Sequence, residues 1–369
     1  MKRILYLFFI VLCCSSAAHS QQPSPKPLRL AVAGMSHGHV PWILNRPARG
    51  DIQLAGIWEP NRKLAERYAK QYGLREDLFF TDLDQMLDAA KPAAVTAFGT
   101  TFDHLKVVRA CAPRGIHVMV EKPLAVNLKH ALEIEALAKK HAIHVLTNYE
   151  TTWYSSTQAL DDLVIKQQVI GPLRKIVVHD GHPGPKEIGV NVEFLEWLID
   201  PVRNGGGALP DFGCYGANLV TWLMRGETPL TVTAITQQIK PEIYSAVEDE
   251  ATIILTYPKA QAILQASWNW PFNRKDIEVY GRTGYVHAPD GRSLRVRKEN
   301  ETQEQTLALE RRSAPTDDPF AYLAAVVRGE VKVADSDLSA LGNNVTVMRI
   351  LEAARQSAAT GKTVKLAPH

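Results

Sequence analysis

The chain has few cysteines, no block of like charges and no internal repeat. Of its 369 residues only four are cysteine, and the formal net charge is +3. A charge this small, without a basic cluster, argues against nucleic acid as a partner. The composition, with 46% hydrophobic and 22% charged residues, is ordinary for a soluble globular protein, and the length suffices for two domains.

The first twenty residues differ from the rest. Two of residues 1–3 are positively charged, residues 4–12 are continuously apolar, and Ala18–Ser20 fits a small-x-small cleavage pattern. This pattern predicts a secretory signal peptide over residues 1–20, cleaved near Ser20 and too short for stable membrane insertion. A flexible leader is expected to follow over residues 21–27.

The distribution of cysteine bears on the compartment. Cys13 and Cys14 raise the alternative of a lipoprotein signal, which is less favoured because neither follows the usual small residue. Removal of the signal leaves Cys111 and Cys214, which we expect in different domains and without a disulfide. An exported protein this poor in cysteine fits a bacterial periplasm better than a disulfide-stapled extracellular module.

The two halves of the chain differ in their expected secondary structure. Residues 28–148 alternate strands and helices, which predicts an NAD(P)-binding Rossmann domain with a doubly wound parallel sheet. Residues 149–369 predict a substrate and oligomerisation domain, an α/β unit with an open, largely antiparallel sheet. The last helices of this domain can pack back on the Rossmann domain. Helices are expected at 62–72, 83–90, 104–112, 128–141, 155–168, 210–224, 319–328 and 344–360. Strands are expected at 28–33, 52–58, 93–98, 116–120, 143–148, 175–179, 230–238, 251–257, 262–268, 276–280 and 293–297.

The loop after the first strand reads Gly34-Met35-Ser36-His37-Gly38-His39. A dinucleotide fingerprint has the form Gly-x-Gly-x-x-Gly, whose glycines permit a tight turn and close approach to pyrophosphate. Here Gly34 and Gly38 remain and Ser36 holds the middle position, so the pattern gains its weight from its place between a strand and a helix start. His37 and His39 have no partner carboxylate or thiolate at metal spacing, and we interpret them as loop residues near the pyrophosphate, with no metal.

Glu59 lies at the end of the second strand, where an acid would bond both ribose hydroxyls and repel a 2′-phosphate. It therefore favours NAD, although Arg62 and Lys63 nearby keep NADP possible. The alternative interpretation of Glu59 is an ordinary solvated acid before Pro60.

Glu121-Lys122-Pro123 directly follows an apolar strand. In an open parallel sheet the carboxyl end of a strand is where ligands bind. Proline biases Lys122 toward an extended conformation, and a lysine held there can become partly desolvated and shift its pKa toward catalysis. A surface loop with a chance Lys-Pro pair is the alternative.

A second pair of candidate residues lies on the helix expected at 210–224. Pro210 suits its first position, and the glycines at 205–207 allow close approach to a ligand. Asp211 and Tyr215 are four apart and face one side, where Asp211 would position a substrate hydroxyl and Tyr215 would move its proton, with Lys122 lowering the phenol pKa. Capping by Asp211 and core packing by Tyr215 are the alternatives.

These segments resemble the glucose-fructose oxidoreductase / inositol dehydrogenase / rhizopine-catabolism (Gfo/Idh/MocA) family, from about Leu28 to the C-terminus. The matching pieces are Ala31–Gly34, Ile57–Glu59, Thr100–His104, His117–Pro123 and Gly205–Tyr215, of which the last two are specific in this order and separation. The resemblance implies a Rossmann domain plus an open-sheet domain often used for oligomerisation, and hence a homo-oligomer. It also implies Lys122 and Asp211 as catalytic residues. The cofactor-binding set becomes Gly34, Ser36, His37, Gly38, Glu59, Thr100, His104, Glu121 and Lys122.

Two departures from the family pattern matter for the chemistry. The glycine fingerprint is degenerate, and Tyr215 stands where many members carry histidine, whereas the glucose-fructose oxidoreductase branch resembles this chain in having tyrosine. Because tyrosine titrates near pH 10 unless perturbed, we expect proton transfer to depend more strongly on Lys122 than in members with histidine.

The expected reaction is hydride transfer between a sugar carbon and nicotinamide. Trp153 and Trp197 are candidate sugar-stacking residues, as are Trp268 and Trp270 on one face of a strand, with packing as the alternative for at least half of them. Since soluble cofactor should be scarce outside the cytoplasm, we expect tight binding and recycling in place. Two alternatives stay open: an NAD-dependent glycosidase that works by transient oxidation and elimination, and a non-catalytic sugar or NAD sensor.

Overall fold

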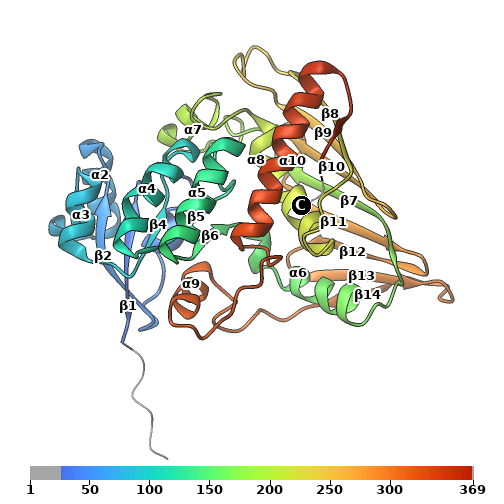
Figure 1. Cartoon of the computed structure of the whole chain (residues 1–369), viewed down its shortest axis with the longest axis horizontal. Coiled ribbons are helices and arrows are strands. Elements are labelled where there is room, and N and C mark those ends of the chain that lie inside the picture. The colour runs from blue at the N-terminus through green and yellow to red at the C-terminus, as the bar shows by residue number, and fades with distance from the viewer. Residues whose placement is uncertain (1–25, 368–369) are drawn as a thin grey trace, which may run out of the picture.

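The computed structural model describes residues 26–367, so the predicted signal peptide and residues 21–25 of the leader lie outside it. A six-stranded sheet forms from the first part of the chain and a nine-stranded sheet from the second (Figure 1). This confirms the predicted fold class, a parallel Rossmann sheet joined to an α/β domain with a mostly antiparallel sheet. Among residues 26–367, no helix is both long enough and apolar enough to cross a bilayer.

The first sheet has the strand order β3-β2-β1-β4-β5-β6, and all its pairs are parallel. Its strands are β1 (Leu28–Ala33), β2 (Ile52–Trp58), β3 (Phe79–Phe80), β4 (Ala94–Ala97), β5 (His117–Glu121) and β6 (Val145–Asn148). Its helices are α1 (Pro41–Leu44), α2 (Arg62–Tyr72), α3 (Leu83–Ala90), α4 (His104–Cys111) and α5 (Leu128–His141). The strand order reverses between β1 and β4, so the carboxyl ends of these strands border the crevice where such sheets bind ligands.

Capping residues explain why several of these helices begin where the sequence predicts. The side chains of Asn61, Asp82 and Asn127 each accept a backbone N–H from the first turn of the helix that follows. At the other end of α2, Gly73 adopts the left-handed conformation that commonly ends a helix. The observed bounds of α2, α3 and α5 agree with the predicted ranges.

The second sheet has the strand order β14-β13-β12-β11-β7-β10-β9-β8-β15. Its strands are β7 (Leu173–Gly181), β8 (Thr231–Gln237), β9 (Glu250–Thr256), β10 (Gln261–Ser267), β11 (Arg274–Gly281), β12 (Gly284–Asp290), β13 (Ser293–Lys298), β14 (Gln305–Ala308) and β15 (Val364–Lys365). β7 and β10 run parallel, and the other pairs among the described strands are antiparallel. β7 is thus a central strand.

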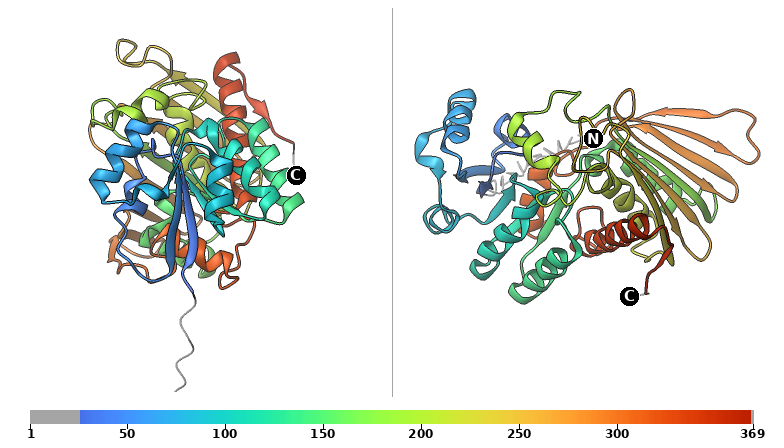
Figure 2. Two further views of the ribbon diagram at one scale, coloured as in Figure 1. Left: turned by 90° about the vertical axis from the view of Figure 1, so that its left-hand side faces the viewer. Right: turned by 90° about the horizontal axis from the view of Figure 1, so that it is seen from above.

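Helices cover one face of this sheet, the face toward the Rossmann domain (Figures 1 and 2). α8 (Ala208–Leu223) is buried along its whole length, between the sheet and α10 (Leu341–Thr360). α6 (Ser155–Leu160) packs on the same side against β12 and β13. The opposite face of the sheet carries no helix of the described chain.

The chain returns to its first domain near the end. α9 (Pro319–Val327) contributes Phe320 and Leu323 to the cluster that contains Leu30 of β1, and the rings of Phe98 and Phe320 lie 6.3 Å apart. One face of the Rossmann sheet is therefore completed by residues nearly 300 positions away in the sequence.

The structure differs from the predicted elements in several places. The helix predicted over 155–168 is α6 followed by a π-helical segment, Asp161–Lys166. The strands β3, β12, β14 and β15 and the short helices α1 and α7 (Val192–Leu198) were not predicted. α8 begins at Ala208, so Pro210 occupies its third position rather than its first; proline still fits, because no N–H in the first turn has a partner inside the helix.

Candidate active site

Lys122 and Asp211 form a buried ion pair where the two domains meet. Lys122 directly follows β5 at the carboxyl end of the parallel sheet, and Asp211 lies in the first turn of α8. The Lys122 ammonium contacts Asp211 Oδ1 and donates a hydrogen bond to the backbone oxygen of Asp211 at 3.1 Å. The two side chains are 7% and 4% exposed, so water screens the pair little. The fold thus brings together two residues that the sequence predicts as catalytic.

Trp268 holds the same carboxylate from a second side. Its Nε1 donates to Asp211 Oδ2 at 2.9 Å, and its side chain is fully buried. β10 ends at Ser267, so the expectation that Trp268 and Trp270 share one face of a strand is wrong. Trp268 positions Asp211 instead of offering its ring to a sugar.

The ion pair fixes the charge of both partners. Burial lowers the pKa of Lys122, but the Asp211 carboxylate outweighs burial and leaves that pKa above its ordinary value. Burial raises the pKa of Asp211, and the charges of Lys122 and His182 bring it below its ordinary value overall. The expectation that desolvation moves Lys122 toward a neutral amine is therefore wrong, because the paired lysine stays an ammonium ion.

Tyr215 lies one turn beyond Asp211, between two lysines. Lys122 Nζ is 5.3 Å and Lys275 Nζ 5.0 Å from the centroid of its ring. Burial first, then the charge of Glu150, raise the pKa of Tyr215 well above its ordinary value. The expectation that Lys122 lowers the phenol pKa is wrong, and Tyr215 keeps its proton near neutral pH.

Two charged residues of the site were missed in the sequence. Lys275 of β11 forms an ion pair with Glu150, which opens the 3-10 turn after β6 (Glu150–Trp153). Asp180 of β7 lies opposite Lys275 in the strand register. The sequence predicts a strand that ends at 179 and another that begins at 276, so each prediction stopped one residue short of these side chains.

The dinucleotide turn contains backbone N–H groups that have no acceptor among the described residues. Gly34 has a φ of +81°, and a Cβ there would lie 2.6 Å from the Gly99 backbone, so only glycine fits where the loops after β1 and β4 touch. Within the described chain the backbone N–H groups of Ser36 and Gly38 donate to no acceptor, whereas those of Met35, His37 and His39 do. Two free donors in a tight turn at the carboxyl end of the sheet fit a pyrophosphate.

Glu59 fixes this turn, a role that the sequence did not reveal. Its Oε2 accepts the Met35 N–H and its Oε1 the Asn61 N–H, both at 2.8 Å, which ties the turn to the end of β2. Burial raises its pKa in spite of these bonds. Each oxygen keeps a second lone pair, so the predicted ribose contact is compatible with the geometry and stays a prediction.

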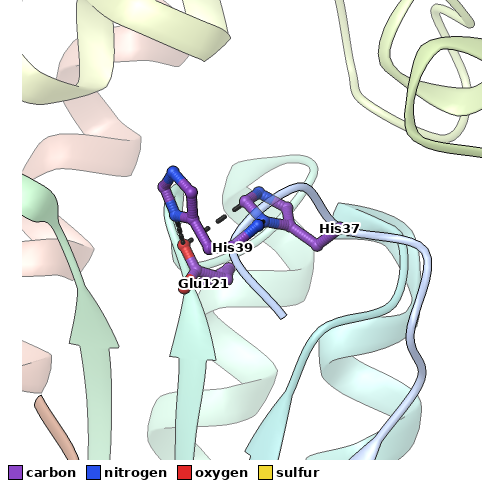
Figure 3. A group of neighbouring side chains, drawn as sticks. All are labelled: His37, His39 and Glu121. Atoms are coloured by element: carbon purple, nitrogen blue, oxygen red, sulfur yellow. Dashed lines mark hydrogen bonds and ion pairs between the residues drawn. The ribbon is translucent and has the colours of Figure 1, made fainter. Parts of the chain in front are cut away.

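His37, His39 and Glu121 form a compact cluster (Figure 3). Both histidines come from the turn after β1 and face Glu121 at the tip of β5, with His39 Nδ1 at 3.0 Å and His37 Nε2 at 4.0 Å from Glu121 Oε2. His37 Nδ1 accepts the His39 N–H at 3.0 Å, which places the hydrogen of neutral His37 on Nε2. A metal bound between His37 and Glu121 would need a lone pair on His37 Nε2, where the hydrogen lies. This network therefore suits hydrogen bonding better than metal binding.

The charges of this cluster are settled by burial and proximity. Burial lowers the pKa of His37 well below its ordinary value, so the ring is neutral. Burial alone would raise the pKa of Glu121, but His39 and His37 lower it to about 2. Asn148 Nδ2 donates to Glu121 Oε1 at 2.7 Å and completes the network beside Lys122.

Two predicted cofactor residues have structural partners of their own. Thr100 caps the 3-10 turn Thr101–Asp103, where its hydroxyl donates to Asp103 Oδ2 at 2.7 Å. His104 is buried, with Nδ1 at 3.2 Å from the Leu124 oxygen in the loop after Lys122, and its Nε2 has no partner among the described residues. Their roles toward a cofactor stay predictions.

The two tryptophans predicted to bind sugar lie in different surroundings. Trp197 of α7 is buried against the dinucleotide turn, with its ring 5.7 Å from that of His37. Trp153 donates from Nε1 to Asn148 Oδ1 at 2.8 Å and packs edge-on against Tyr322. Their predicted sugar contacts remain untested.

α7 packs over the dinucleotide turn between the two domains, and we call this helix the α7 arch. The Phe194 ring lies 4.7 Å from that of His37 and 3.3 Å from where a Cβ on Gly38 would be. Glu193 of the arch accepts a hydrogen bond from the Tyr68 hydroxyl of α2 at 2.8 Å and pairs with Arg67 at 2.5 Å. Glu193, near the start of α7, thus ties the arch to α2 of the Rossmann domain.

Comparison with protein families gives two adjoining matches. Residues 28–149 match an oxidoreductase family with an NAD-binding Rossmann fold, and residues 162–287 match the GFO/IDH/MocA C-terminal domain. Together they cover more than half of the chain.

Curated relatives match over a shorter length. Trans-1,2-dihydrobenzene-1,2-diol dehydrogenase from Xenopus tropicalis is 30% identical over 223 residues, 60% of this chain and 59% of that protein. Glucose-6-phosphate 3-dehydrogenase from Bacillus subtilis is 22% identical over 56% of each chain. The chain thus matches less than two thirds of the length of these relatives.

Solved structures share the fold over nearly the whole chain. An inositol dehydrogenase homolog from Azotobacter vinelandii, complexed with NAD+, superposes with a TM-score of 0.79 at 18% identity, covering 92% of this chain and 98% of that one. The aldose-aldose oxidoreductase from Caulobacter crescentus gives a TM-score of 0.75 at 20% identity, with 92% and 100% coverage. At these identities the likeness extends to the fold alone.

Proposed function

This chain belongs to the Gfo/Idh/MocA oxidoreductase family, and we propose that it oxidises a hydroxyl carbon of a sugar or sugar derivative by hydride transfer to bound NAD. The observation that carries the proposal is the buried Lys122–Asp211 pair at the carboxyl end of the Rossmann sheet. Both members of the pair face the boundary between the cofactor domain and the nine-stranded sheet. Relatives whose names specify diol and sugar phosphate dehydrogenases support this class of substrate.

The chain itself supplies orientation and charge. When bound, NAD supplies the hydride acceptor. The Lys122 ammonium stabilises negative charge that develops on the reacting oxygen, since it is positive and poorly screened. Asp211, fixed by Lys122 and Trp268, accepts a hydrogen bond from a neighbouring hydroxyl and so orients the sugar.

We propose NAD rather than NADP. The Glu59 carboxylate at the end of β2 would repel a 2′-phosphate, and its buried position leaves little room for one. Arg62 and Lys63, at the start of α2, remain the candidate partners of a 2′-phosphate if NADP binds instead.

The cofactor is proposed to stay bound and to be recycled in place. The support is the α7 arch, which packs Phe194 and Trp197 against the dinucleotide turn and is fastened to α2 through Glu193. A retained cofactor suits the proposed export to the periplasm, for which the N-terminal sequence pattern is the basis. The overall reaction would then be redox-neutral, with one sugar oxidised and another reduced.

Replacement of Lys122 by Met tests the central assignment. We expect Lys122→Met to abolish turnover of aldoses and inositol while NAD stays bound, as read by nicotinamide absorbance after denaturation. Lys129→Met, an exposed lysine on α5, is the matched control and should keep full activity. Near-normal activity of Lys122→Met would refute the assignment.

A second experiment separates the two redox-neutral schemes. The protein as purified, without added cofactor, is incubated with paired α- and β-nitrophenyl glycosides and nitrophenol release is followed. Release from both anomers would replace the proposed oxidoreductase by a glycosidase that oxidises and eliminates at a resident NAD. Oxidation of free sugars without release supports the proposal.

A further inference from the structure

The end of β7 presents a carboxyl group to the catalytic helix. Along this strand Ile176, Val178 and Asp180 alternate and are buried on the face that α8 covers, while His179 belongs to the opposite face. Asp180 is 2% exposed, about as little as Asp211.

Asp180 lacks the partner that a buried carboxyl normally has. Its Oδ1 has no hydrogen-bond partner among residues 26–367. The cations nearby are engaged elsewhere, Lys122 with Asp211 and Lys275 with Glu150. A buried carboxyl oxygen without a partner is costly, so its position near the Lys122–Asp211 pair points to a ligand that supplies the missing bond.

We propose that Asp180 exchanges a proton with the substrate hydroxyl, an inference that rests on the function proposed above. In the oxidation, the C–H bond of the substrate carbon breaks and hydride passes, with both electrons, to the oxidised nicotinamide. The O–H bond of the same carbon also breaks, and its electron pair forms the second carbon–oxygen bond. Its proton goes to Asp180 Oδ1, and reduction of a carbonyl runs the same steps in reverse.

The surroundings of Asp180 suit it to carry a proton. Burial raises the pKa of Asp180 well above its ordinary value, and the charges of Asp276 and Glu150 add to the rise. Lys275 and Lys122 oppose it without cancelling it. A carboxyl whose pKa moves upward approaches the range in which a general acid–base group works at neutral pH.

Two uncharged titratable groups near Asp180, Cys214 and His182, have pKa values displaced away from pH 7. On α8, burial raises the pKa of Cys214 to about 12. Burial lowers the pKa of His182 to about 4, and His182 Nδ1 already accepts the Gly184 N–H at 3.0 Å. The remaining groups on the packed elements are tyrosines with raised pKa values or members of ion pairs: Tyr149, Tyr154, Tyr215, Lys122, Asp211, Lys275, Glu150 and, on the far face, Asp276 and His179.

The test compares Asp180→Asn with Asp276→Asn. Asp276 pairs with Arg274 and His179 on the opposite face of the sheet, so its variant controls for a lost carboxylate in the same sheet. With the aldose or inositol that the wild type oxidises fastest, we expect Asp180→Asn to lower kcat by about 100-fold or more. It should also flatten the fall of kcat/KM at acid pH. Asp276→Asn should keep kcat and retain that fall, shifted to lower pH because the charge of Asp276 no longer raises the pKa of Asp180.

A readout without turnover guards against misfolding and against failure of the proposed function. In protein labelled with 13C at aspartate carboxyls, the resonance missing from Asp180→Asn should titrate above the ordinary aspartate range. An ordinary titration of that resonance, or a wild-type pH profile in Asp180→Asn, would overturn the inference. A wild type that binds NAD but oxidises no sugar would instead count against the proposed function.

Discussion

At the residue scale, the site keeps most of its ionisable groups in a single charge state. Lys122 and Asp211 hold each other charged, His39 and Asn148 hydrogen-bond Glu121 and hold it charged, and burial keeps Tyr215 protonated. Such an arrangement is preorganised, because no group has to change its charge before a substrate binds.

Gly34→Ala tests the contact between the loops after β1 and β4. The added Cβ would meet the Gly99 backbone at 2.6 Å in a residue with a φ of +81°. We expect a fall in Tm of several degrees and loss of NAD binding, measured by thermal unfolding with and without NAD. Gly50→Ala is the control: its φ is +73° but nothing lies within 4 Å, so it should show the cost of the backbone alone, about 1–2 kcal/mol. Equal effects of the two variants would contradict the steric argument.

The pH dependence of stability tests the cluster around Glu121. Its pKa is lowered to about 2 in the folded protein, so its stabilising contribution is present above its unfolded pKa and is lost as pH falls toward 2. We expect Glu121→Gln to lose less free energy of unfolding than the wild type between about pH 5 and 2, a difference of at most roughly 3 kcal/mol. Urea unfolding at a series of pH values measures it, and parallel curves would refute the pairing.

The sequence was sufficient to find Lys122 and Asp211, because each lies in a recognisable local pattern. It did not reveal Asp180 or Lys275, because only the pairing of β7 with β11 brings these two residues opposite each other. It also misjudged the direction of two pKa shifts, since the net effect of burial and ion pairing depends on distances that a sequence does not contain.

At the element scale, the Rossmann strands and their capped helices were predictable because apolar runs and N-caps are local signals. α7 was not predicted, because a helix of seven residues is shorter than the window over which a helical period can be recognised. Its identity as a helix depends on Phe194 and Trp197 packing against the dinucleotide turn, a tertiary contact.

The arch predicts a measurable effect on cofactor release. Glu193→Gln weakens the bonds to Tyr68 and Arg67, so NAD should dissociate faster than from the wild type, by about tenfold if the bonds contribute about 1.4 kcal/mol to the closed state. Stopped-flow displacement of bound NADH, followed by fluorescence, measures the rate. Glu196→Gln, an exposed residue of the same helix, should leave the rate unchanged. Identical rates in all three proteins would remove the arch as a cause of retention.

At the scale of the whole molecule, the nine-stranded sheet has one covered and one uncovered face. On the uncovered face the register aligns Val177, Ile263 and Ile254 across β7, β10 and β9, all partly exposed. A central apolar stripe on a sheet without helices supports the prediction of a homo-oligomer through this domain.

Ile263→Arg tests that prediction. A guanidinium in the middle of the stripe should dissociate an oligomer formed through this face, because its burial would leave a charge unpaired. Light scattering coupled to gel filtration measures the mass, with Gln85→Arg on α3 as the control for added charge. A wild-type protein that is already monomeric, or an Ile263→Arg protein of unchanged mass, would rule out this face.

The packing of α9 on the Rossmann sheet has a consequence for biogenesis. Since α9 completes a face whose other buried members come from residues 28–146, the first domain cannot finish its core while the ribosome is still making the second. The nascent first half therefore keeps an apolar surface exposed throughout synthesis, which suits engagement by a chaperone and delays its commitment to the folded state. The synthesis of Pro319–Val327 sets the moment at which the first domain can complete its core.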